Sequence, residues 1–192
     1  MARLVHLVRH GETEWTREGR WQGKTDIPLS DAGRAQAHEL KERLRDRGIT
    51  RIHASDLSRA RETAEIVAAA LGPTPLLVTL DALLRERGFG CFEGLTRQEC
   101  ERLHPEAWAR YVADRRSTPP DAEPQPEVVS RMLAALTDIA REAPEGSGIL
   151  VVSHGGAIRS FIHAVTGRVP APLGNGELFI ARFEDDRFLS ID

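Results

Sequence analysis

The chain has 192 residues, of which 41 % are hydrophobic and 29 % are charged, and its formal net charge is −3. These values are typical of a soluble globular protein, and the length suits one compact domain with a sizeable core. The acidic balance provides no field that would draw the whole protein to nucleic acid or to a membrane surface. Two cysteines and the lack of an apolar run of ~20 residues lead us to expect a cytoplasmic protein with free thiols.

The first half of the chain alternates short apolar segments with amphipathic ones. The pattern predicts strands at about 3–8, 51–54 and 76–78, and helices at about 31–47 and 58–71. Ser30 stands where a helix N-cap residue is favoured, and Gly48 stands where that helix is expected to end.

The second half begins with an irregular, glycine-rich segment at 85–95, and four prolines lie between 117 and 126. Two short helices are expected between these segments, at about 96–103 and 105–116. We interpret about 88–126 as a lid or insertion within a single domain that spans 1–192. The remaining expected elements are a helix at about 127–142, a strand at 149–152, a helix at about 155–166 and a hairpin at about 177–184 and 187–191.

Alternating strands and helices predict an α/β fold: a three-layer α/β/α sandwich with a mainly parallel sheet and a small helical lid. Ligands of such folds bind beyond the carboxyl ends of the strands. The first strand runs into Arg9, His10 and Gly11, and the strand at 149–152 runs into Ser153-His154-Gly155. Two strands therefore deliver a histidine and a glycine to the same edge, which is how a chain would build an anion-binding site. The alternative is two ordinary strand-to-loop turns that happen to carry histidine, and Arg9 beside His10 disfavours it.

Two further segments belong to the same candidate site. Arg59 lies in the first turn of the helix at 58–71, and a helix N-terminus favours anions. Glu86 lies among arginines and glycines on the irregular segment. Taken alone, Glu86 is better explained by a surface ion pair with Arg85 or Arg87.

Four motifs follow one another along the chain: R-H-G-E-T-E-W at 9–15, S-D-L-S-R-A-R-E-T-A at 55–64, L-R-E-R-G-F-G at 84–90 and V-S-H-G-G at 152–156. Together they resemble the histidine phosphatase superfamily, in its phosphoglycerate-mutase-like branch with broad-specificity and alpha-ribazole-type phosphatases, over about 3–165. The resemblance implies that His10 is the nucleophile that takes the phosphoryl group. It further implies that Arg9, Arg59 and His154 bind the phosphoryl oxygens and that Glu86 donates a proton to the leaving oxygen.

These residue types suit phosphoryl transfer. Negative charge spreads over three equatorial oxygens in the transition state, so fixed positive donors stabilise it. His10 must attack as a neutral imidazole, and the neighbouring Arg9 and Arg59 should lower its pKa. The resemblance implies that the carbonyl of Gly11 fixes the tautomer of His10. Because arginines supply the positive charge, we expect neither a metal nor a cofactor.

The segment 15–28 resembles the family pattern W-N-x-x-x-R-x-Q-G-x-x-D-x-x-L, except that Thr16 replaces the asparagine. We expect Thr16, Gln22, Gly23 and Gly155 on the substrate side, although loop structure explains Gln22 and Gly23 equally well. A G-E-S motif of the related phosphatases survives only as Glu123.

The same five catalytic residues serve a phosphatase or a mutase. Mutases of the family carry a longer insertion, which excludes water, whereas residues 87–148 here must hold the lid, the proline-rich linker and a helix. We therefore favour a metal-independent phosphomonoester hydrolase over a cofactor-dependent phosphoglycerate mutase. A catalytically silent phosphate-binding protein is the third alternative, disfavoured because it would need neither His10 nor Glu86. The expected partner is a small phosphorylated metabolite, not nucleic acid or a membrane, and the expected state is a monomer or homodimer.

Overall fold

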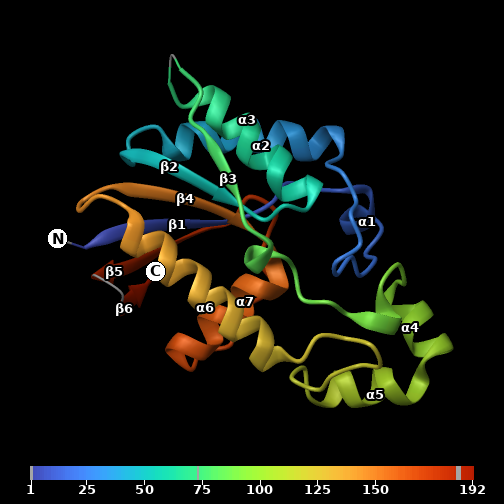
Figure 1. Cartoon of the computed structure of the whole chain (residues 1–192). Coiled ribbons are helices and arrows are strands. Elements are labelled where there is room, and N and C mark those ends of the chain that lie inside the picture. The colour runs from blue at the N-terminus through green and yellow to red at the C-terminus, as the bar shows by residue number, and fades with distance from the viewer. Residues whose placement is uncertain (1, 73, 185–186) are drawn as a thin grey trace.

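The computed structural model describes residues 2–72, 74–184 and 187–192 and contains one six-stranded sheet (Figure 1). Its strand order is β3-β2-β4-β1-β5-β6. The strands are β1 (Arg3–Arg9), β2 (Ile49–Ala54), β3 (Val78–Leu80), β4 (Gly148–Ser153), β5 (Leu178–Glu184) and β6 (Arg187–Ile191). The first four run parallel, and β5 and β6 add an antiparallel edge, so the mainly parallel sheet is confirmed.

The register of the central strands brings the two histidine segments together. β1 pairs with β4 in parallel, and Arg9 lies opposite Ser153 at the carboxyl ends of the two strands. The next residues, His10 and His154, therefore leave the sheet side by side. This placement follows from parallel pairing, which puts the carboxyl ends of both strands at one edge.

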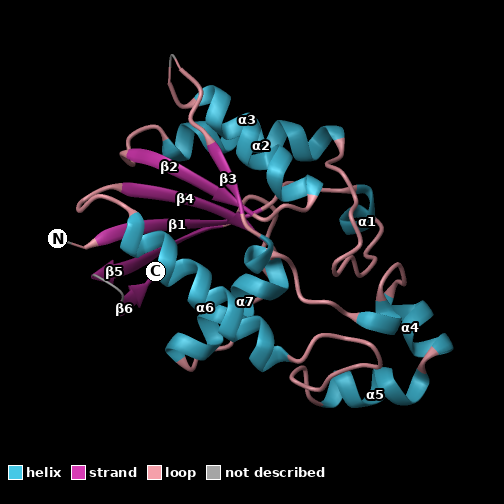
Figure 2. Ribbon diagram, in the orientation of Figure 1, coloured by secondary structure: helices cyan, strands magenta, loops and turns pink. Residues whose placement is uncertain are grey.

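Helices cover both faces of the sheet (Figure 2). The helices α2 (Asp31–Leu44) and α3 (Ser58–Ala70) pack on one face, and α6 (Gln125–Glu142) and α7 (Gly155–Thr166) pack on the other. Leu7 and Val8 of β1 face opposite clusters, as successive residues of a strand do. The predicted three-layer α/β/α architecture is confirmed.

The helices α4 (Arg97–Leu103) and α5 (Pro105–Ala113) lie away from the sheet (Figure 1) and contribute residues to a third hydrophobic cluster. It joins Phe89 and Phe92 to Trp108 and Tyr111, and Trp21 packs against it. The expected lid segment therefore has a small aromatic core of its own. The single domain over 1–192, with a lid at about 88–126, stays a prediction.

Several element boundaries differ from the expected ones. The third strand lies at Val78–Leu80 instead of 76–78, because Val78 and Leu80 pair with Ile52 and Ala54 of β2. The helix α2 ends at Leu44, and α6 already begins at Gln125, since Pro126 is tolerated in a first turn. A short helix α1 (Glu14–Arg17) was not expected; Thr13 and Thr16 form its capping box. Within the described residues, no helix combines the length and apolarity of a membrane span.

Candidate active site

A cavity of about 1040 Å³ lies at the carboxyl ends of the strands. Eight of the nine residues predicted for the site line it: Arg9, His10, Thr16, Gln22, Gly23, Arg59, Glu86 and Gly155. The ninth, His154, is fully buried behind this surface, and its ring centroid lies 5.0 Å from that of His10. The structure thus brings together side chains from four separate segments of the chain.

His10 is held in one tautomer by its own backbone. Its ring Nδ1 lies 2.6 Å from the carbonyl oxygen of Gly11. Because a carbonyl only accepts, Nδ1 carries the proton and donates, which leaves a lone pair on Nε2 of the neutral ring. Burial, followed by the charges of Arg59 and Arg9, holds the pKa of His10 well below its usual value. His10 is therefore a neutral imidazole with a free lone pair near pH 7.

His154 is held in the opposite tautomer by Arg59. The Nε of Arg59 donates to Nδ1 of His154 at 3.2 Å, so the proton of the neutral ring lies on Nε2. That Nε2 has no hydrogen-bond partner among the described residues. Burial and the charge of Arg59 hold the pKa of His154 well below its usual value. His154 can therefore offer an N–H to a bound oxygen without carrying charge.

Two carbonyl oxygens fix the rest of the Arg59 guanidinium. Nη1 donates to Thr25 and Nη2 donates to Gly23, each at 2.8 Å. Burial lowers the pKa of Arg59 to about 10, so it remains charged at neutral pH. The arginine is oriented in advance by the loop that follows α1.

Arg9 leaves β1 beside His10 and reaches the segment before β5. Its Nη1 donates to the carbonyl of Leu173, while its buried Nε lacks a hydrogen-bond partner among the described residues. Asn175 of the same segment donates to the carbonyl of His10 at 3.1 Å. Burial lowers the pKa of Arg9, and the nearby carboxylates of Glu86 and Glu177 oppose that effect. The site thus holds a second cation with donor capacity to spare.

Glu86 lies at the N-terminus of α7. Its Oε2 accepts the backbone N–H of Gly156 at 2.9 Å, and its Oε1 accepts those of Ala157 at 2.8 Å and Arg87 at 2.7 Å. A helix N-terminus is a favourable place for a carboxylate because its first N–H groups have no partner within the helix. Glu86 therefore forms no ion pair with Arg85 or Arg87, the alternative that the sequence left open, and lies beside the histidines.

The similarity of this chain to known proteins extends over nearly its whole length. The model of the histidine phosphatase superfamily (branch 1) matches residues 5–190. The chain belongs to the histidine phosphatase superfamily. The family resemblance expected from the four motifs is confirmed.

Relatives of this histidine phosphatase superfamily member include proteins named for mutases and for phosphatases. Phosphoglycerate mutase-like protein 4 of Arabidopsis thaliana is 41 % identical over 159 residues, which cover 81 % of this chain and 68 % of the relative. The solved structure of Mycobacterial hydrolase 1 has a TM-score of 0.88 at 28 % identity, covering 100 % of this chain and 97 % of the other. A mycobacterial glucosyl-3-phosphoglycerate phosphatase in complex with VO3 has a TM-score of 0.84 at 29 % identity, covering 93 % and 92 %.

In this superfamily member, side chains around Thr13 hold the turn of α1 and the loop that follows it. The hydroxyl of Thr16 donates to the carbonyl of Thr13 at 2.8 Å and accepts the N–H of the same residue at 2.8 Å. The Oε1 of Gln22 accepts from the Thr13 hydroxyl at 3.0 Å. Thr16 therefore lines the cavity, but its hydroxyl already donates its proton within the capping box and does not point a free donor at a phosphate.

Gly23 adopts a φ of +55° that disfavours side chains, and a Cβ there would overlap the carboxylate of Glu93. That carboxylate accepts from the backbone N–H groups of Lys24 and Thr25. Gly23 is thus explained by loop structure as well as by its place in the cavity wall.

Three further residues, which the sequence motifs do not include, support the site. Arg131 of α6 binds the backbone around Glu86, and Leu173 and Asn175 hold Arg9 and His10. Leu173 acts through its carbonyl, which leaves no trace in the sequence. The available signal for Arg131 was a charge next to the buried Met132 on an otherwise apolar helix face. Within the described residues, no three His, Cys, Asp or Glu side chains are placed to hold a metal ion.

Proposed function

We propose that this protein is a metal-independent phosphomonoester hydrolase that acts through a phosphohistidine on His10, with Glu86 as the proton donor. The observation that carries the proposal is the opposite tautomers of the paired histidines. His10 has its lone pair on Nε2, as a nucleophile needs, and His154 has its proton on Nε2, as an oxygen-binding donor needs. The substrate is a small phosphorylated metabolite.

In the first step, the lone pair of His10 Nε2 forms a bond to phosphorus as the bond to the ester oxygen breaks. In its acid form Glu86 donates a proton to the leaving oxygen, since an alkoxide is a poor leaving group. The products are a free alcohol, a phosphohistidine and the Glu86 carboxylate.

In the second step, the Glu86 carboxylate takes a proton from a water molecule. The oxygen of that water forms a bond to phosphorus as the bond to His10 Nε2 breaks. Inorganic phosphate leaves, His10 regains its lone pair, and Glu86 is again protonated for the next cycle.

Positive donors stabilise the charge on the phosphoryl oxygens in both steps. Arg9, Arg59 and the N–H of His154 supply them, and burial strengthens each interaction relative to water. The carbonyl partners of Arg59 orient it before the substrate binds, so little reorganisation is needed. The cavity extends to Tyr111, Arg115 and Arg159, which leaves room for a substrate larger than phosphate.

A phosphoglycerate mutase is the second candidate, favoured by the name of the Arabidopsis relative. It would use the same residues but return the phosphoryl group to a reoriented product before water enters. We favour the hydrolase because, in the part of the chain that the structure describes, the segment 88–126 that we interpret as the lid is short and has α4 and α5 as its α-helices.

The deciding experiment incubates the purified protein, with a chelator, with 3-phosphoglycerate and a panel of phosphomonoesters. Inorganic phosphate and 2-phosphoglycerate are followed together. We expect phosphate release that disappears in His10→Ala. Formation of 2-phosphoglycerate without phosphate, especially after priming with 2,3-bisphosphoglycerate, would make the protein a mutase. If neither phosphate nor 2-phosphoglycerate forms, the result favours a phosphate-binding protein.

A further inference from the structure

The segment that carries Glu86 has little regular structure, yet its backbone is held by one side chain. Residues 85–89 connect the short 3-10 helices η1 (Ala82–Leu84) and η2 (Gly90–Phe92). Arg131 of α6 donates through Nη1 to the carbonyls of Leu83 at 2.7 Å and Arg85 at 2.6 Å. Its Nη2 donates to the carbonyl of Glu86 at 3.0 Å. One guanidinium therefore binds three carbonyls at and before Glu86.

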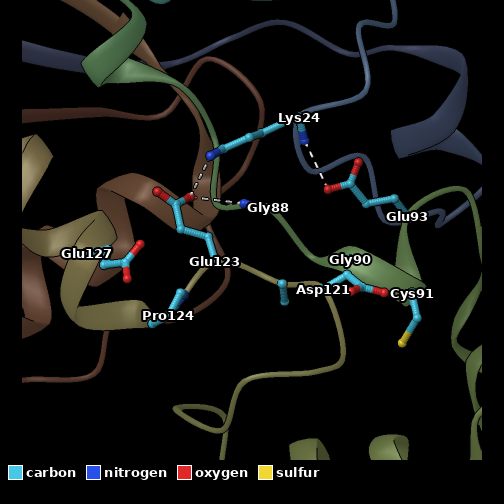
Figure 3. A pocket seen from close by; sticks show the side chains of 10 residues that line it. Lys24, Gly88, Gly90, Cys91, Glu93, Asp121, Glu123, Pro124 and Glu127 are labelled. Atoms are coloured by element: carbon cyan, nitrogen blue, oxygen red, sulfur yellow. Dashed lines mark hydrogen bonds and ion pairs between the residues drawn. The ribbon is translucent and has the colours of Figure 1, made fainter.

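Glu123 holds the guanidinium of Arg131 and the other side of the same segment. Its Oε1 accepts from Arg131 Nε at 2.8 Å, and its Oε2 accepts from Arg131 Nη2 at 3.0 Å. The same Oε2 accepts the backbone N–H of Gly88 at 3.1 Å, and Lys24 lies 3.4 Å from it. Figure 3 shows Glu123 between Lys24 and Gly88, at the wall of a second cavity of about 670 Å³.

The two side chains form a shielded pair. The exposed fractions are 13 % for the Arg131 side chain and 10 % for that of Glu123. Charge-assisted bonds of this forked kind are the stronger hydrogen bonds of proteins, and shielding from water preserves them. The pair fixes the backbone on both sides of Glu86, while neither residue lines the catalytic cavity.

We propose that Arg131 and Glu123 are positioning residues that hold the Glu86 carboxyl at the point from which it donates its proton. The inference rests on the proposed function and deepens it. Proton transfer requires donor and acceptor within hydrogen-bond reach, and a displacement of about 1 Å can cost about 100-fold in rate. The charge of Arg131, after burial and the charges of Arg59 and His10, also helps to lower the pKa of His154.

The test compares two substrates that differ in their need for an acid. The leaving group of p-nitrophenyl phosphate needs little protonation, whereas that of glycerol 3-phosphate needs a proton. In Arg131→Met, we expect kcat for glycerol 3-phosphate to fall about 10- to 100-fold, and kcat for p-nitrophenyl phosphate to fall less than about 3-fold. Inhibition by inorganic phosphate should stay near wild type, because Arg9, Arg59 and His154 are untouched.

Three variants make the test specific. Arg141→Met removes an exposed arginine from the same helix, where it pairs with Asp138, and should change neither substrate's rate. Glu86→Gln should show the same preference for p-nitrophenyl phosphate as Arg131→Met, and the double variant should be no more selective than Glu86→Gln alone. Glu123→Gln keeps the shape of the side chain but replaces one acceptor by a donor, and it serves if Arg131→Met does not fold.

Equal slowing of both substrates by Arg131→Met and by Glu123→Gln would overturn the positioning role, as would extra selectivity in the double variant. Failure of the proposed function looks different. In that case His10→Ala would retain phosphate release, or the wild type would hydrolyse neither substrate. If His10→Ala is inactive and Glu86→Gln is selective while Arg131→Met is not, only the positioning role fails.

Discussion

The two histidine–glycine turns of the sheet look alike in sequence and differ in construction. Both follow a strand in the middle of the sheet, and β1 and β4 are paired so that the turns leave side by side. His10 is followed by a loop and takes its tautomer from the adjacent Gly11 carbonyl. His154 is followed directly by α7 and takes its tautomer from Arg59, a residue 95 positions away. The neighbour of Nδ1, rather than the motif, decides which nitrogen carries the proton.

The two turns also exclude a side chain at their glycines for different reasons. A Cβ on Gly11 would lie 2.4 Å from the backbone carbonyl of Gly33 at the start of α2. A Cβ on Gly156 would lie 2.6 Å from Oε1 of Glu86. The first turn is therefore constrained by packing against a helix, and the second is constrained by the proton donor. Glycine is thus needed for packing of the fold at position 11 and for the placement of Glu86 at position 156.

The largest expected effect comes from the His10 turn. His10→Ala removes the only lone pair assigned to attack, so turnover should fall below about 10⁻⁴ of wild type. No acid-labile, alkali-stable phosphate should appear on the protein after a rapid quench with a labelled phosphomonoester. His38→Ala, on the exposed face of α2, is the matched control and should behave as wild type. Phosphoprotein in His10→Ala would place the nucleophile elsewhere.

The His154 turn should give a smaller and different loss. His154→Ala removes one N–H from the phosphoryl oxygens, and loss of a single such donor costs about 10²–10³ in kcat. The phosphoprotein should still form on His10, only more slowly. His154→Gln, which offers an N–H at similar reach, should recover part of the rate. If both histidine variants lack the phosphoprotein entirely, the two turns do not divide the chemistry as we propose.

The glycines provide a still smaller contrast. Gly156→Ala should push the Glu86 carboxylate away from α7 and lower turnover of an alkyl phosphate by about 10-fold, with a weaker effect on p-nitrophenyl phosphate. Gly11→Ala should instead lower the free energy of unfolding by about 1–3 kcal/mol, because backbone must move to admit the methyl group. Thermal unfolding and the two rates, measured on both variants, separate these effects. Equal loss of stability in both variants would remove the distinction.

Much of this site could be predicted because strand ends are easy to locate. The apolar runs of β1 and β4 stop abruptly at Arg9 and Ser153, and parallel pairing then places both turns at one edge. The strand β3 begins two residues after the start of the expected strand at 76–78, because a three-residue edge strand carries almost no periodic signal. The apolar pattern of the sequence predicted an element well wherever that element was long and buried.

The supporting contacts could not be predicted in the same way. The hydroxyl of Thr16 takes part in the capping box of α1, a four-residue helix that is too short to show a periodic pattern of apolar residues in the sequence. Arg131 contacts carbonyl oxygens about 45 residues upstream, and its partners depend on the path of a segment without regular structure. Side chains that recognise backbone leave no motif at the position they recognise, so only the folded chain reveals them.

A further buried histidine, His6 of β1, gives the smallest and most selective test of how burial keeps histidine rings neutral in this protein. His6 lies on β1, which pairs with β4 and β5, and it is fully buried; neither ring nitrogen has a hydrogen-bond partner among the described residues. Burial, with the charge of Arg47, lowers the pKa of His6 to about 4, against about 6.5 in an unfolded chain. Between these values the unfolded chain binds a proton that the folded one does not, so stability falls as the pH falls from 6.5 toward 4.

His6→Leu removes this one contribution while His10 and His154 keep theirs. We expect the loss of unfolding free energy between pH 7.5 and pH 5 to shrink by about 1–2 kcal/mol, as one pKa unit corresponds to about 1.4 kcal/mol and shielding of the ring is incomplete. Urea unfolding at the two pH values measures it, with the exposed His38→Leu as control. An unchanged pH slope in His6→Leu would mean that the acid sensitivity comes from the other buried histidines, His10, His53 and His154, because burial lowers the pKa of each of them.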